Sequence, residues 1–269
     1  MSRLTVFWLL HTIALAIFLV GSGVNVSIWL EGSVEGRPRA GLRGALGATW
    51  RWLRRAGLRR TARALLRDGL FHRRLFAAHR GRWLAHAVVL GAFGAMFALS
   101  VLTGFCQEVL IHLLHVRHPL LAAIANKDTP FIALANEALG LVMLAGVALI
   151  AVRRYVRRAA ELRTGPADTA LIVLLGATLL SGYPTEVLRL VMEQVPAEVA
   201  RYSFLAYPLS LGLRGLDWPW QRLHYWTFIF HSTLASATIA YLPFGRLFHV
   251  FAGPLVATAN AVAREVEGA

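Results

Sequence analysis

The stretch WTFIFHSTLASATIAYLPFGRLFHV, residues 226–250, decides the fold class of this chain. It is apolar over a length that suits a membrane-spanning helix, which needs about 20 such residues. His231 and His249 lie eighteen residues apart within it. On a continuous helix that spacing is about five turns, so both imidazoles would share one face, roughly 27 Å apart along the axis. Since the hydrocarbon core is about 30 Å thick, we expect one imidazole near each membrane face.

Pro243 lies between the two histidines. Proline removes one backbone hydrogen bond from a helix, so we predict a kink at this point. The distance along the axis is then an upper limit. A kink could also turn one of the two imidazoles away from the shared face.

The composition of the whole chain is typical of helical membrane proteins. Of its 269 residues, 57% are hydrophobic, and the mean hydropathy is +0.56. These values are too apolar for a soluble domain of this length. The single cysteine, Cys106, excludes an internal disulfide and an iron–sulfur cluster ligated by cysteines of this chain alone. We expect any such cluster to belong to a partner.

Five stretches are long enough to cross a bilayer. They predict an all-α bundle of five transmembrane helices, which forms a single membrane domain over residues 1–269. The first stretch follows Arg3 but lacks a clear signal-peptide cleavage pattern, so we expect it to be retained. The predicted spans are residues 6–30, 83–105, 131–152, 167–191 and 226–250.

Arginines cluster in two of the connections between these spans. The formal net charge is +14, but the basic residues alternate with apolar spans, a pattern of membrane topology signals that argues against nucleic-acid binding. Fourteen arginines lie in the connection 31–82, and a second cluster follows the third span. The positive-inside rule therefore predicts a multi-pass protein of a bacterial or archaeal inner (plasma) membrane. Its N-terminus lies outside, and its basic connection and C-terminus are cytoplasmic.

The basic cytoplasmic connection, residues 31–82, also contains apolar residues at near-helical spacing. This pattern predicts one or two amphipathic helices that lie on membrane lipid or against a partner protein. Composition favours neither kind of docking. We expect His72 and His79, which lie in this connection, to be surface or docking residues.

Histidines inside the predicted spans are candidates for chemistry, because ionisable residues in a bilayer are usually functional. His86 begins the second span on the same side as His249. A haem ligated by both imidazoles requires only that these two spans be neighbours. His231 lies in the outer half, where Met96, about 15 Å outward from His86, is a candidate thioether ligand. Core packing is the alternative role of Met96, and an outer haem with one protein ligand, or none, stays open.

Two motifs resemble one protein family. Phe230–His231 with IAYLPFGRLFHVFAGPL (239–255), together with RWLAH (82–86), resembles the last and second spans of the respiratory nitrate reductase gamma subunit. The resemblance is closer still to the cytochrome b subunits of heterodisulfide reductase. It implies that His86 and His249 hold an inner haem b, and that His231 provides one ligand of an outer haem. The other outer histidine of that family falls at Met96, where this chain departs from the pattern.

The resemblance also implies a quinone site at the outer face and a cytoplasmic iron–sulfur subunit as partner. The chain would then be an electron-transfer subunit of a membrane oxidoreductase, without activity of its own on the terminal substrate. Glu108, Glu186 and His224 are candidates for exchanging quinone protons, although interfacial positions at helix ends explain them as well. Arg82 and Arg246 are candidates for pairing with the inner haem propionates, or serve only as topology signals.

Two other classes of function remain compatible with the sequence. One is a proton-coupled transporter in which His11, His86 and His231 relay protons. The other is a non-redox membrane anchor that recruits a soluble complex through its basic connection. Both alternatives predict purified protein without haem absorbance.

Overall fold

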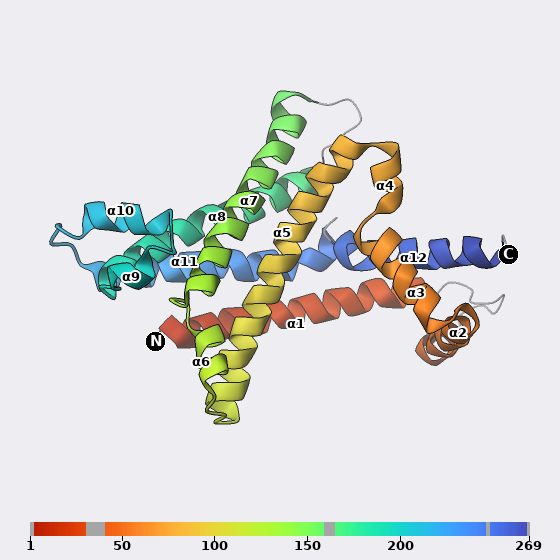
Figure 1. Cartoon of the computed structure of the whole chain (residues 1–269), viewed down its shortest axis with the longest axis horizontal. Helices are drawn as coiled ribbons and strands as arrows, with labels where there is room; N and C mark the ends of the chain where they lie inside the picture. The colour runs from red at the N-terminus through yellow and green to blue at the C-terminus, as the bar shows by residue number, and fades with distance from the viewer. Residues whose placement is uncertain (1–2, 31–40, 159–164, 246–247, 268–269) are drawn as a thin grey trace. The chain divides into compact units, whose positions relative to one another are not determined.

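The computed structural model describes residues 3–30, 41–158, 165–245 and 248–267, and these residues are helical with short connections and no strand (Figure 1). Five helical segments in this part of the chain are long and apolar enough to cross a membrane. The predicted all-α fold with five spans is therefore confirmed. The five segments are Arg3–Ile28, Arg80–Leu113, Pro119–Val156, Pro166–Met192 and Trp220–Glu265.

The helices divide into two compact units, which we describe separately. The first unit comprises Met1–Leu10 and Val88–Ala235, and the second comprises His11–Ala87 and Ser236–Ala269. Three long helices contribute to both units: α1 (Arg3–Leu30), α5 (Arg80–Gly104) and α11 (Trp220–Tyr241).

The first unit is built around α7 (Pro130–Ala151) and α8 (Pro166–Met192). A buried cluster of Ala92, Met143, Val147 and Leu179 joins these two helices to α5. Gly146 allows the approach, because a Cβ at this position would collide with the side chain of Val89. The remaining elements of the unit are η2 (Phe105–Leu113), α6 (Pro119–Ala125), η3 (Val152–Val156), α9 (Ala197–Ala200) and α10 (Ala206–Leu213).

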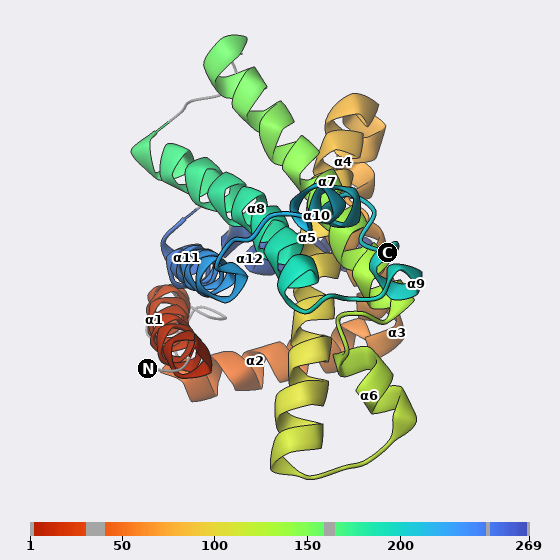
Figure 2. The same ribbon diagram turned by 90° about the vertical axis from the view of Figure 1, so that its left-hand side faces the viewer.

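A second apolar cluster in this unit holds α9 and α10 against the end of α8. Val187 and Leu190 of α8 are buried with Val195, Ala200 and Ala206. Figure 2 shows α10 lying beside the last turns of α8. The segment between the fourth and fifth predicted spans is therefore folded onto the membrane helices.

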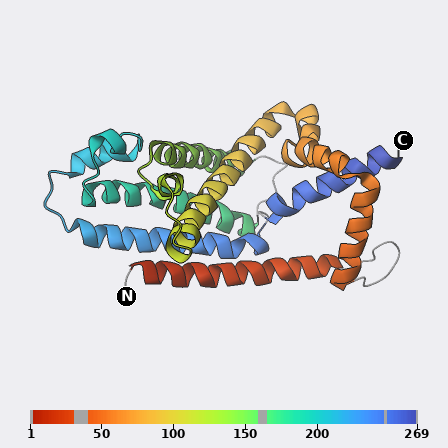
Figure 3. The same ribbon diagram turned by 60° about the horizontal axis from the view of Figure 1, so that its bottom comes forward.

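The second unit contains the basic connection, which is helical over most of residues 41–78. Its elements are α2 (Gly41–Ala56), α3 (Leu58–Ala64), η1 (Leu65–Leu70) and α4 (Arg73–Ala78). The turns of α3 and η1 pack against α12 (His249–Glu267) (Figure 3). Gly69 is required at this contact, since a Cβ there would lie 2.9 Å from the carbonyl oxygen of Pro254. Arg67 adds an ion pair to Glu265 of α12 at 2.9 Å.

The helix predicted over residues 226–250 is interrupted. Helix α11 ends at Tyr241, a 3-10 turn follows over Leu242–Phe244, and α12 begins at His249. Within the second unit, α12 leaves in a different direction from the last turns of α11 (Figure 3). Proline lacks the amide hydrogen and clashes with the preceding turn, so Pro243 ends the helix and does more than kink it. The expectation that one continuous helix carries both His231 and His249 was therefore wrong.

Candidate functional site

The two histidines predicted to form the inner pair face each other in the second unit. His86 lies in the second turn of α5, and His249 is the first residue of α12. Their ring centres are 6.2 Å apart, with an angle of 26° between the ring planes. The ring planes are therefore close to parallel, and the two imidazoles, from α5 and α12, lie near each other.

A third histidine joins this pair, one that the sequence analysis treated as a surface residue. The ring centre of His72 lies 4.8 Å from that of His86, in an edge-to-face arrangement. His72 adopts the left-handed conformation at φ 48° between η1 and α4. Its Nδ1 lies 2.9 Å from the carbonyl oxygen of Leu70. No periodicity in the sequence indicates this contact, because it depends on a single left-handed turn.

In the first unit, His231 of α11 contacts α8. Its Nδ1 lies 3.1 Å from the carbonyl oxygen of Thr178 and 3.0 Å from Oγ of Ser181. Because a carbonyl only accepts hydrogen bonds, the contact with Thr178 favours a hydrogen on Nδ1 and a lone pair on Nε2. That tautomer is the one in which an imidazole ligates a metal through Nε2 while its other nitrogen is held by an outer partner.

Met96, the second predicted ligand of the outer site, packs in the core of the first unit. It contacts the buried cluster formed by Ala92, Met143, Val147 and Leu179. This is the ordinary gap-filling role of a methionine. The ligand role of Met96 stays a prediction.

Gly182 gives the His231 ring its place against α8. A Cβ on Gly182 would lie 3.3 Å from Cε1 of His231, whereas a Cβ on Gly176, also in α8, would lie at an ordinary 3.7 Å from Val147. Alanine at either position gains up to about 1 kcal/mol of helix propensity. We expect Gly176→Ala to keep this gain and Gly182→Ala to lose it through overpacking, a difference of about 1–2 kcal/mol. Thermal unfolding of the two variants in detergent measures this difference, and equal melting temperatures would show that the ring is not confined.

The three residues proposed for quinone protons all lie in the first unit. Glu108 is on η2, where its carboxylate lies 3.3 Å from Nδ1 of His112. His224 of α11 is buried, and its Nδ1 accepts a hydrogen bond of 3.1 Å from the guanidinium of Arg3. An imidazole whose Nδ1 accepts is neutral and carries its hydrogen on Nε2, where it acts as a donor.

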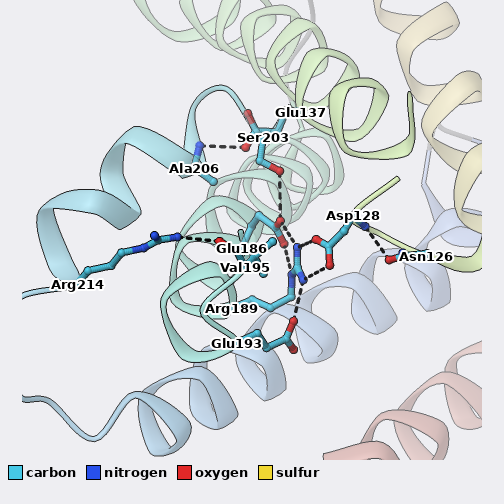
Figure 4. A network of polar contacts seen from close by, with 10 residues as sticks. All are labelled: Asn126, Asp128, Glu137, Glu186, Arg189, Glu193, Val195, Ser203, Ala206 and Arg214. Carbon is cyan, nitrogen blue, oxygen red and sulfur yellow. Dashed lines mark hydrogen bonds and ion pairs between the residues drawn. The ribbon is translucent and has the colours of Figure 1, made fainter. Parts of the chain in front are cut away.

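Glu186, the third residue proposed for quinone protons, belongs to an ion-pair network centred on the buried Arg189 (Figure 4). The guanidinium of Arg189 contacts Asp128 at 2.7 Å, and Glu186 and Glu193 at 2.8 Å each. Ser203 also donates to Glu186 at 3.4 Å. The network joins α8 to the loop that precedes α7.

Glu137 is a buried carboxylate that the sequence analysis did not single out. It lies in the second turn of α7 and accepts hydrogen bonds from the backbone amides of Leu205, at 2.6 Å, and Ala206, at 2.9 Å. These amides begin α10, so a negative charge here satisfies a helix N-terminus. Tyr183 of α8 donates to the carbonyl oxygen of Glu137 at 3.2 Å. Glu137 is therefore a structural anchor for α10.

Arg82 and Arg246 are the two arginines that were predicted to pair with haem propionates. Arg82 lies in the first turn of α5, one turn before His86. Arg246 lies outside the described residues. Within the described part of the chain, no group of three or more histidine, cysteine or acidic side chains is arranged to hold a bare metal ion.

Comparison with known proteins identifies the family. Residues 118–262, more than half of the chain, match the family model of the nitrate reductase gamma subunit. The chain belongs to the nitrate reductase gamma subunit family. The resemblance predicted from the sequence is thus confirmed, and the matched range includes the motif at residues 239–255. With its five candidate spans, this member of the family is a multi-pass membrane protein.

Curated relatives of this gamma-family chain include subunits of membrane oxidoreductases. It is 26% identical over 266 residues to a subunit of the dihydromethanophenazine:CoB–CoM heterodisulfide reductase of Methanosarcina thermophila, and the match covers 94% of this chain and 90% of the relative. The corresponding protein of Methanosarcina barkeri is 27% identical over 265 residues, covering 93% and 89%.

A third relative is the EtfAB:quinone oxidoreductase of Syntrophomonas wolfei, 33% identical over 131 residues. This match covers 44% of the chain but spans only 18% of the length of the relative. No solved structure matches the chain significantly.

Proposed function

We propose that this protein is the haem b membrane subunit of a quinone-linked respiratory oxidoreductase. It would pass electrons between a quinone site at the outer face and a cytoplasmic iron–sulfur partner. The proposed location is the inner membrane of the cell. The positive-inside rule supports placing the basic connection and the C-terminus on the cytoplasmic side. The names of the relatives support the redox role, since one belongs to a heterodisulfide reductase and another is a quinone oxidoreductase.

The single observation that carries this proposal is the pairing of His86 with His249. Haem iron takes imidazole ligands from facing helices, and His86 and His249 would hold it from α5 and α12. Their ring centres lie 6.2 Å apart. A haem b bound there would supply reversible one-electron transfer. Ligands from α5 and α12 would also cross-link these two helices of the second unit.

The other residues of the proposal have distinct tasks. Arg82 would hold a propionate through charge-assisted hydrogen bonds, as would Arg246. His224, held by Arg3 as a neutral donor, is suited to binding a quinone carbonyl oxygen. Glu108 is the more accessible of the two proposed carboxylates, because Glu186 is engaged by Arg189.

The test of this function is a reduced-minus-oxidised spectrum of the purified protein with a haem-to-protein ratio. We expect a b-type band from the inner site at a ratio near one, or near two if His231 also ligates haem. The core packing of Met96 predicts that Met96→Leu leaves this ratio unchanged. Loss of one haem in Met96→Leu would instead assign Met96 as a ligand. A wild-type protein without a b-type band would refute the proposal and favour a transporter or an anchor.

A further inference from the structure

An open groove lies on the surface of the basic connection in the second unit. Its volume is about 810 Å³. It runs between α3 and η1 on one side and α4 with the first turn of α5 on the other. It is lined by Arg59, Ala62, Arg63, Leu66, Arg67, Phe71, Arg73, Phe76 and Trp83.

The floor of the groove is apolar and accessible. Leu66 is 54% exposed, Phe71 is 65% exposed and Phe76 is 41% exposed. Trp83 lies edge-to-face against Phe76 and donates from Nε1 to the carbonyl oxygen of Phe71 at 2.7 Å. Contiguous apolar side chains that face outward in this way mark a binding surface for another apolar group.

Arginines form the rim. Arg59, Arg63 and Arg67 are spaced four residues apart, so they follow one edge of the continuous helical turns of α3 and η1. Arg67 is engaged by Asp68, at 2.8 Å, and by Glu265, and these carboxylates raise its pKa. Among the described residues, no carboxylate pairs with Arg59, Arg63 or Arg73. The rim therefore offers guanidinium groups to an anion.

The groove also lies where the chain enters the membrane. Trp83, which lines it, stands in the first turn of α5, at the start of the second candidate span, Arg80–Leu113. Tryptophan is enriched at the level of the lipid headgroups, where its ring is partly apolar and its N–H is polar. Lipids of the bilayer are therefore close enough to bind in the groove.

We propose that this groove binds an anionic phospholipid. Its phosphate is held by the rim arginines Arg59, Arg63 and Arg73, and an acyl chain covers the floor formed by Leu66, Phe71 and Phe76. Guanidinium groups bind phosphate oxygens in a bidentate manner, and basic pockets beside transmembrane helices are suited to lipid headgroups. The combination of an apolar floor and a phosphate-binding rim matches both parts of one lipid molecule. This site is independent of whether the protein binds haem.

Native mass spectrometry of the full chain in detergent tests the proposal, with dioleoyl phosphatidylglycerol and dioleoyl phosphatidylcholine as probes. We expect clear preference for phosphatidylglycerol in the wild type. One arginine near an anionic headgroup is worth about fivefold in affinity. Arg59→Gln with Arg63→Gln should therefore weaken phosphatidylglycerol binding by about 25-fold. Leu66→Gln should weaken the binding of both lipids, because it places a polar group on the floor.

The matched control is Arg60→Gln with Arg74→Gln. These arginines lie on α3 and α4 and do not line the groove. Their substitution removes the same charge as the substitution of Arg59 and Arg63. The control should bind phosphatidylglycerol as the wild type does. Equal loss in control and groove variants, or equal binding of the two lipids by the wild type, would overturn the proposal and leave the groove to an acidic protein segment. Displacement of the lipid by glycerol phosphate, with Leu66→Gln binding normally, would also overturn it, because it would indicate a site for free phosphate.

Discussion

Replacement of His249 by alanine is expected to remove the b-type haem signal of the inner site. His249 supplies one of the two imidazoles of the inner pair, and without it His86 would be left as the single protein ligand of the pair. Loss of a metal ligand should cost at least as much as the roughly 10- to 100-fold in affinity that loss of an outer partner costs. The haem-to-protein ratio and a redox titration of the b-type band measure this loss.

Two controls separate ligation from general damage in His249→Ala. The first is His79→Ala, which removes a histidine of the basic connection that has no described contact with the pair. It should keep the wild-type ratio. The second is added imidazole, which should restore part of the band in His249→Ala, since His249 is exposed. If the His249→Ala variant kept the wild-type haem-to-protein ratio, this result would contradict the assignment of the inner pair.

The number of membrane helices was predictable from the sequence, but the interruption of the last helix was only partly so. Length and hydropathy determine a span, because every backbone polar group in lipid must be satisfied within the helix. Pro243 predicts a local defect. Whether the chain bends or stops there depends on tertiary contacts, such as the hydrogen bond of 2.8 Å from Asn25 to the carbonyl oxygen of Pro243. Such a contact over 218 residues of sequence separation has no local signal.

The same division applies to the site. His86 and His249 were predicted as a pair because both lie on the same side of the membrane, and depth follows from position along a helix. His72 was missed, because its approach to His86 requires a left-handed turn that is rare for a residue other than glycine. Glu186 was a candidate for proton exchange because a carboxylate can take up and release protons. It pairs with Arg189 three residues later on the same helix, whereas the contact of Arg189 with Asp128, 61 residues away in sequence, has no local signal.

The Arg189 network makes a second large effect predictable. Arg189→Met should destabilise the protein by about 3 kcal/mol, because the guanidinium is the cation that several carboxylates share in a partly buried site. The side chain of Arg189 is only 8% exposed, while that of Asp128 is 29% exposed and that of Glu186 is 26% exposed. Water therefore screens the remaining carboxylates only in part. For a unit of this size we expect the melting temperature in detergent to fall by roughly 6–12 °C.

Three further variants show whether this loss comes from the shared charge. Arg201→Met removes an arginine that contacts only the ring and hydroxyl of Tyr202, and it should change the melting temperature by no more than about 2 °C. Arg189→Lys keeps the charge but not the fork of donors, so its melting temperature should be intermediate. Adding Asp128→Asn and Glu186→Gln to Arg189→Met removes two of the unpaired charges and should recover about half of the loss. If the triple variant is no more stable than Arg189→Met, uncompensated charge is not the cause, and the methionine destabilises the unit by breaking the tie between α8 and the loop before α7.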